Sequence, residues 1–141
     1  MNHLESLVPA RETCERMKAA GFPQDTAFVW GPPQYKGPSP RSAFRGEETC
    51  AAPTLQEILG QFPCPLRRAV YNYSDGSLVR YVEGEITVTA NARPCVRLNW
   101  GERGYTDRVE CHENTAEAAA HLYLALSSAS LLPTQPEEAG R

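Results

Sequence analysis

The amino-acid sequence predicts an α+β fold, in which an antiparallel sheet of about four to six strands carries two or three helices packed on one face. Two observations support this fold class. Residues 9–22, 54–63 and 114–133 each have the signals that begin or end a helix. Between residues 66 and 111 apolar and polar residues instead alternate, which is typical of strands joined by short turns.

The first helix is expected to begin at Pro9, because the first turn of a helix does not need the N–H that proline lacks. Gly21 is placed to end this helix in the left-handed conformation, after which Phe22 can fold back onto Met17. Residues 1–8 are interpreted as a lead-in segment.

Residues 27–30 predict a short strand, because aromatic and β-branched side chains lie between Pro23 and Gly31. Residues 31–50 contain four prolines, at positions 32, 33, 38 and 40, and show no hydrophobic period. They predict a long proline-rich loop, which is either a mobile surface segment or a binding element.

The other two helices are marked by their first turns. Thr54 and Glu57 have the spacing of a capping box, in which each side chain satisfies a backbone N–H of the other residue. Asn114 and Glu117 are expected to cap the last helix. Alanines recur along this last helix, so we expect it to lie close to the sheet.

The strands begin with a predicted hairpin of residues 69–73 and 78–82. Asp75 and Gly76 form the favoured two-residue turn between them, because both positions of that turn have positive φ. Residues 83–85, with the sequence Glu-Gly-Glu, are interpreted as a second turn.

Strict alternation then predicts strands at residues 86–90 and 95–100. Residues 101–104 form a hairpin loop in this interpretation, and residues 105–111 the last strand. In the second of these strands Val96, Leu98 and Trp100 share one face, and Cys95, Arg97 and Asn99 share the other.

Length and composition narrow the class of protein. We expect one domain over residues 1–133 and a disordered tail over residues 134–141. The net charge of −3 argues against duplex nucleic acid as a partner. No apolar run reaches the roughly 18 residues of a membrane helix.

The five cysteines are odd in number and contain no Cys-x-x-Cys pair, so they predict a reduced, cytoplasmic chain with cysteine used as a small apolar residue.

Arginine dominates the basic residues. Twelve of the fourteen are arginine, and residues 66–108 hold seven arginines against five acids. Codon bias of a GC-rich genome and guanidinium recognition of phosphate or carboxylate are both open as explanations.

Three patches of the chain, in this order, resemble a family of small uncharacterised proteins that bacteriophages and integrated mobile elements encode. The patches are residues 20–24 (AGFPQ) with residues 28–30 (FVW), residues 51–59 (AAPTLQEIL) with Pro63, and residues 116–126 (AEAAAHLYLAL). The resemblance implies a phage-type accessory protein and brings no established catalytic residue. The matched positions are caps, turns and core faces, so we expect function in the proline-rich loop or on the sheet.

The sequence contains no recognisable catalytic or metal motif. A phosphate-binding glycine loop and a nucleophile elbow are both missing, and carboxylates do not pair convincingly. Cys111 and His121 have no further ligands at the short spacing of zinc sites, so no metal site is expected. His112 is expected to be exposed and His121 partly buried. We therefore expect no enzyme and no cofactor.

Arginine and aromatic side chains on the predicted strands are the remaining signal. A solvent-exposed sheet face that carries arginine and aromatic side chains can stack nucleic-acid bases and bind phosphates. A half-buried sheet with aromatic core residues and solvated arginines is the other interpretation. Tyr71 and Tyr73 share a face, whereas Arg80 and Tyr81 point in opposite directions, so only part of the set can converge. The candidate ligand-binding residues are Arg67, Arg68, Tyr71, Tyr73, Arg80, Arg97 and Trp100.

The expected function is that of a non-enzymatic accessory protein in the cytoplasm of a host cell, which binds a host component and counters host defence. It would do so by sequestering a small nucleotide signal or by blocking a host protein. The alternative is a structural or assembly protein of a virion or replication module. Homo-oligomer formation is left open.

Overall fold

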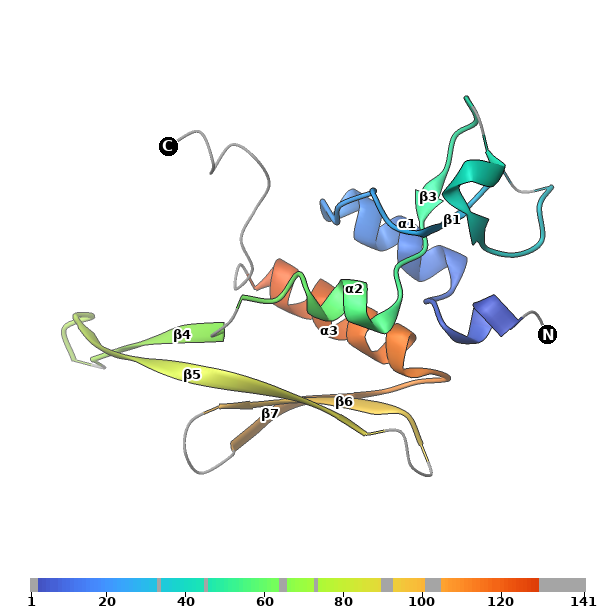
Figure 1. Cartoon of the computed structure of the whole chain (residues 1–141). Helices are drawn as coiled ribbons and strands as arrows, with labels where there is room; N and C mark the ends of the chain where they lie inside the picture. The colour runs from blue at the N-terminus through green and yellow to red at the C-terminus, as the bar shows by residue number, and fades with distance from the viewer. Residues whose placement is uncertain are drawn as a thin grey trace.

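Helices and sheets form three layers in the computed structural model of the chain (Figure 1). The structure describes residues 3–32, 34–44, 46–63, 66–72, 74–89, 93–100 and 105–129. A four-stranded antiparallel sheet forms one layer and the helices α2 and α3 cover one of its faces. Helix α1 and a small three-stranded sheet lie beyond them. The α+β prediction is therefore confirmed.

The larger sheet has the strand order β4-β5-β6-β7, so neighbours in sequence are neighbours in the sheet. Its strands are β4 (Leu66–Tyr71), β5 (Leu78–Thr89), β6 (Cys95–Trp100) and β7 (Tyr105–Cys111). The helices are α1 (Arg11–Ala19), α2 (Leu55–Leu59) and α3 (Thr115–Ser128). The predicted tail and the predicted loop at residues 101–104 lie outside the described residues.

The smaller sheet takes one of its three strands, and part of another, from the segment predicted as a proline-rich loop. Strand β1 (Phe28–Trp30) lies between β2 (Ser39–Pro40) and β3 (Cys50–Ala51). Short 3₁₀ turns occur at η1 (His3–Ser6) and η2 (Arg41–Ala43). The segment over residues 31–50 therefore contains β2, η2 and the first residue of β3, and is not an unbroken loop.

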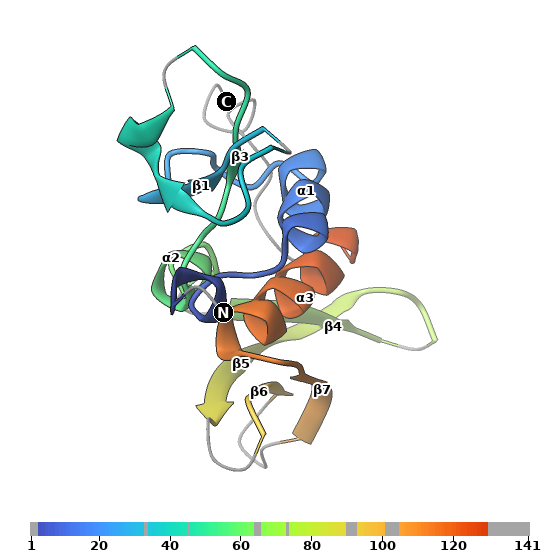
Figure 2. The same ribbon diagram turned by 90° about the vertical axis from the view of Figure 1, so that its right-hand side faces the viewer.

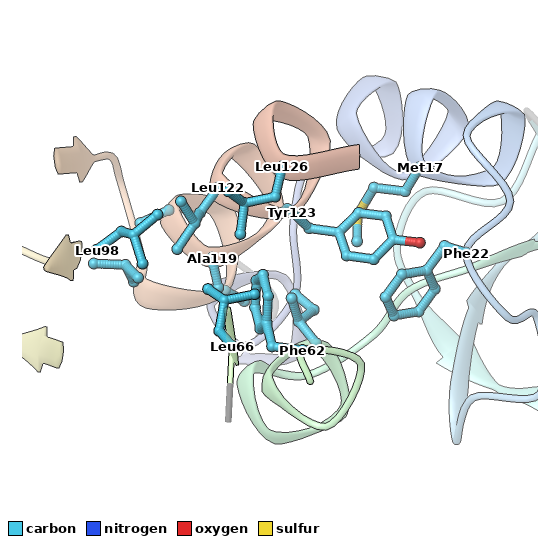
Figure 3. Packing of buried hydrophobic residues seen from close by; sticks show 14 of the residues in the cluster. Met17, Phe22, Phe62, Leu66, Leu98, Ala119, Leu122, Tyr123 and Leu126 are labelled. Atoms are coloured by element: carbon cyan, nitrogen blue, oxygen red, sulfur yellow. The ribbon is translucent and has the colours of Figure 1, made fainter. Parts of the chain in front are cut away.

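The core lies between the larger sheet and α3, and continues to α1 (Figure 3). Leu98 of β6 and Leu122 of α3 are fully buried within it. Farther along, Tyr123 of α3 meets Phe22 edge-to-face, with ring centroids 5.0 Å apart. Three consecutive alanines of α3, at positions 118–120, are fully buried, which lets the helix lie close to its neighbours as expected. The predicted stripe does not extend to Ala129, which is exposed.

The predicted end of α1 and the predicted starts of α2 and α3 form, but the start of α1 differs from the prediction: the helix begins at Arg11, and Pro9 lies before its extended N-cap residue Ala10. Gly21 has φ 95°, and the Phe22 N–H donates to the carbonyl of Met17 at 2.9 Å. Thr54 and Glu57 form the complete capping box of α2. The Asn114 side chain accepts the N–H of Glu117 at 2.8 Å. Local chemistry therefore fixes the end of α1 and the starts of α2 and α3, but not the start of α1.

Gly84 lies inside β5, so the turn predicted at residues 83–85 is wrong. Gly84 pairs with Leu66 of β4 on one side and with Trp100 of β6 on the other. A Cβ atom at this position would lie 2.7 Å from the ring of Trp100. The glycine therefore leaves space for the indole to lie across β5. This close approach, and not a tight turn, explains why position 84 is a glycine.

The β4–β5 hairpin is confirmed, but its connection is longer than the two-residue turn expected. The strands end at Tyr71 and resume at Leu78, and Gly76 has φ 75°. The side chain of Asn72 accepts the N–H of Ser74, and that of Asp75 accepts the N–H of Ser77, both at 2.9 Å. Side-chain hydrogen bonds to the backbone therefore order this longer loop.

Cys95 and Cys111 form a disulfide, which corrects the prediction of a fully reduced chain. The two residues face each other directly in the β6–β7 ladder, with Cα atoms 4.1 Å apart. Cys14 and Cys50 are free and buried, as expected for cysteine used as an apolar residue. The pairing depends on the register of β6 and β7, which brings the two cysteines together. The odd number of cysteines, on which the prediction relied, carries no information about that register.

Candidate functional site

Two histidines stack where the end of β7 meets α3. His112 directly follows β7, and His121 lies in the second turn of α3. Their ring centroids are 4.0 Å apart and the ring planes differ by 7°. Both rings are half-buried, which confirms the expectation for His121 and corrects the exposed position expected for His112.

Each ring has its own carboxylate partner. His112 Nε2 lies 3.0 Å from Glu110 Oε1, and Arg108 donates to the other oxygen of Glu110 at 3.0 Å. Burial raises the pKa of Glu110, but the hydrogen bonds from His112 and Arg108 outweigh that effect, and the pKa falls below its ordinary value. Glu110 is therefore held as a carboxylate.

Glu117 is the partner of His121, with Oε2 at 2.7 Å from Nε2. The same carboxylate accepts the Thr13 hydroxyl at 2.7 Å and the Ala10 N–H at 2.8 Å. Burial raises the pKa of Glu117, but these three hydrogen bonds more than compensate, and the pKa lies below its ordinary value. Glu117 thus joins the start of α1 to α3.

A cleft of about 430 Å³ opens beside this cluster. Arg11, Trp30 and Lys36 form one side, and His112, Asn114 and Glu117 belong to the other. The Arg11 guanidinium lies over the Trp30 ring, 5.4 Å from its centroid, and donates to the carbonyl of Gly31. The cleft is therefore polar and of mixed charge, with a buried carboxylate in its wall.

The free thiols near the cleft are poor nucleophiles. Burial raises the pKa of Cys14 to about 12, and burial also raises the pKa of Cys50. Both thiols stay protonated at neutral pH, and a thiol reacts only as its thiolate.

The arginine and aromatic residues selected from the sequence do not form one face. Arg68 and Trp100 lie on the helix side of the sheet, where the guanidinium is 4.8 Å from the indole centroid. Trp100 is only 2% exposed, so it cannot stack a base from solution. Arg67 projects from the opposite side and lies 3.9 Å from Glu83. This weak, exposed ion pair and the buried cation–π pair occupy different faces.

The remaining members of that set are also dispersed. Arg97 is exposed on β6, on the sheet face opposite Trp100. Tyr71 and Arg80 are exposed on the outer part of the β4–β5 hairpin. Tyr73 lies outside the described residues. A single arginine and aromatic pocket is therefore not formed by the described members.

The outer part of the β4–β5 hairpin instead presents large apolar side chains. It extends away from the helices in two perpendicular views (Figures 1 and 2). The exposed fractions are 62% for Tyr71, 49% for Leu78, 57% for Val79 and 58% for Tyr81. We call these four residues the hairpin patch. Farther along β5, Val82, Ile86 and Val88 pack against the core, so only the outer part is uncovered.

Sequence reasoning missed the cluster of Glu110, His112 and His121, although one signal was present. Glu110 and His112 are two residues apart at the end of a strand, which places both on one side of it. His121 joins them only through the packing of α3, and its distance in sequence from His112 matches no familiar ligand spacing.

Comparisons of the chain with protein-family models, with curated proteins and with solved structures found no match. None of the helices that the structure describes has the length and apolar character that crossing a membrane requires.

Proposed function

We propose that this protein is a non-enzymatic binding protein that docks on another protein through its β4–β5 hairpin. The observation that supports the proposal is the hairpin patch, in which four large side chains are each about half exposed or more. A contiguous apolar patch on a soluble protein is typical of an interaction surface.

Strand geometry shows how the patch would be presented. Tyr71 and Leu78 are direct partners across the hairpin. Val79 is the extra residue of a bulge, because Val70 pairs with Arg80 and Tyr71 pairs with Leu78. A bulge increases the local twist and re-aims side chains. Tyr71 pairs with Leu78, and Tyr81 pairs with the residue two positions before Tyr71, so these three side chains share one face of the outer hairpin that a partner would cover.

Charge indicates the chemistry of the partner. Arg80 is exposed on the outer hairpin beside the hairpin patch and has no ion-pair partner among the residues that the structure describes. Among the strands that the structure describes, β4 is also an edge strand, and an edge of this kind can pair with a partner strand. We therefore propose a protein surface with an apolar groove and an adjacent carboxylate.

We further propose, from the phage-type accessory protein that the sequence analysis expects, that the partner is a host protein and that the consequence is interference with host defence. Sequestration of a nucleotide is the less favoured form, because the indole of Trp100 is buried and the arginines lie on different faces. A purified protein that carries excess absorbance at nucleobase wavelengths would reverse this preference.

Site-specific photo-crosslinking tests the proposal. A photoreactive residue is placed at Tyr81 of the hairpin patch, or at Val109, which is exposed on β7 at the other edge of the sheet. We expect one bacterial protein to be crosslinked from position 81 and not from position 109. The Val79→Thr/Tyr81→Ser variant should then bind the purified partner at least 10-fold more weakly, and Val109→Thr should bind normally.

Equal crosslinking from both positions, or unchanged affinity of the double variant, would contradict docking through the hairpin. Light scattering addresses the alternative function. Self-association that the Val79→Thr/Tyr81→Ser variant abolishes would favour a structural or assembly protein, because the hairpin patch would then be covered by a second copy.

A further inference from the structure

We infer that Glu110, His112 and His121 form a binding site for a divalent transition-metal ion. Each residue offers one ligand atom, and the three atoms lie within 4.8 Å of one another. Two imidazoles and one carboxylate are a donor set that suits Zn²⁺, Ni²⁺, Co²⁺ and Fe²⁺. The inference is independent of the docking function, because the cluster and the hairpin patch use different residues.

The backbone that carries the ligands is rigid. Glu110 lies in the β6–β7 ladder opposite Val96. The disulfide of Cys111 holds the next residue, and the His112 N–H donates to the carbonyl of Pro94 at 3.1 Å. His121 lies within α3, which is packed on β6 and β7. Ligands on rigid elements lose little freedom when an ion binds.

The side chains are close to a chelating arrangement and need one movement. The rings are nearly parallel, so the nitrogen lone pairs, which lie in the ring planes, do not yet converge on one point. His112 borders the cleft, so its ring can turn about its side-chain bonds toward Glu110 and His121. The ion would replace the direct hydrogen bond between His112 and Glu110.

Glu117 supplies the outer support that metal-binding histidines usually have. It accepts the N–H from one ring nitrogen of His121 in the arrangement that leaves the other nitrogen for the ion. Thr13 and the Ala10 N–H hold the same carboxylate in place. The cleft lies beside the site, so water or an anionic ligand can complete the coordination.

Calorimetric titration of EDTA-treated, dialysed protein with ZnCl₂ tests the site. We expect saturable binding of one ion per chain, and at least 10-fold weaker binding in His112→Ala and in His121→Ala. His3→Ala is the matched control, because it removes the third histidine, and its affinity should equal that of the unaltered chain. A Co²⁺ complex should lack thiolate-to-metal absorption, which separates this site from binding by free cysteines.

A second measurement does not depend on the folding of variants. Histidine modification by diethylpyrocarbonate, followed by mass spectrometry, should be slower at His112 and His121 when Zn²⁺ is present, and unchanged at His3. The inference is overturned if Zn²⁺, Ni²⁺ and Co²⁺ show no saturable binding. It is equally overturned if the bound ion neither depends on His112 nor protects it.

Discussion

Glu117 of α3 accepts the backbone N–H of Ala10, the residue immediately before α1, at 2.8 Å. No side chain of the α1 segment caps that helix. The carboxylate of Glu117 therefore provides the missing cap from another helix, and its negative charge lies at the positive end of the α1 dipole. Glu57 of α2 also accepts a backbone N–H from a distant segment, that of Ala27 at 3.1 Å, but this residue precedes the strand β1 and no helix.

Replacement of Glu117 should destabilise the whole domain. In Glu117→Gln the amide keeps the shape but loses the charge that three donors share, and we expect a loss of about 1–3 kcal/mol in the free energy of unfolding. Urea denaturation measures this change. Glu113→Gln is the control, because Glu113 is exposed one turn earlier in the chain. Equal midpoints for both variants would contradict a capping role.

Acid should weaken the metal-free fold through the same carboxylate. The pKa of Glu117 in the folded chain lies below its ordinary value of 4.5, because its hydrogen bonds outweigh burial. A lowered pKa gives stability that is complete above the ordinary value and is lost as the pH falls through the folded value. Urea midpoints measured from pH 7 down to pH 3 should therefore fall below about pH 4.5. The urea midpoint of Glu117→Gln should fall less steeply with decreasing pH. If its pH dependence is parallel to that of the unaltered chain, Glu117 is not the group responsible for the acid sensitivity.

Substitution of Gly84 should disturb the sheet. The Cβ of Gly84→Ala would lie 2.7 Å from the ring of Trp100, so the indole must move, at a cost of about 1–3 kcal/mol. Thermal unfolding and indole fluorescence report the change. Gly60→Ala is the matched control, since its Cβ would lie at an ordinary distance of 3.4 Å from the carbonyl oxygen of Gln56. If the two alanine variants have the same unfolding temperature, the close approach of Trp100 does not restrict the residue at position 84.

Reduction of the disulfide should also lower stability. The bond between Cys95 and Cys111 closes a loop with a sequence separation of 16, for which chain entropy predicts about 3 kcal/mol. Cys95→Ser/Cys111→Ser should melt at a lower temperature than the oxidised chain and should not respond to reductant. Intact-mass spectrometry of air-oxidised protein checks that the disulfide forms. If every cysteine is found as a free thiol, the expectation is wrong.

Sequence reasoning worked where structure depends on near neighbours. The caps at Gly21, Thr54 and Asn114 follow from the residues within one helical turn, and alternation correctly placed Val96 and Leu98 in the core. Gly84 was misinterpreted because its two glutamate neighbours resemble a turn, whereas Trp100, which is distant in sequence, determines its position.

The candidate sites were harder to predict, because they depend on contacts between distant segments. His112 and His121 meet only after α3 packs on the sheet. Arg67 and Arg68 are adjacent in sequence yet lie on opposite faces, and a composition-based interpretation combines them. Alternation along the strand separates the two arginines, but which of the two faces the helices cover depends on tertiary packing, which a single sequence does not supply.

β5 is twelve residues long, whereas β4 and β6 have six each, and the two ends of β5 have different surroundings. Its inner end packs against the hydrophobic core through Val82, Ile86 and Val88, but its outer end contributes almost nothing to the core. Natural selection can therefore change the side chains near Val79 freely while the fold persists. A lineage of such proteins could follow a changing target by substitution at a few hairpin positions.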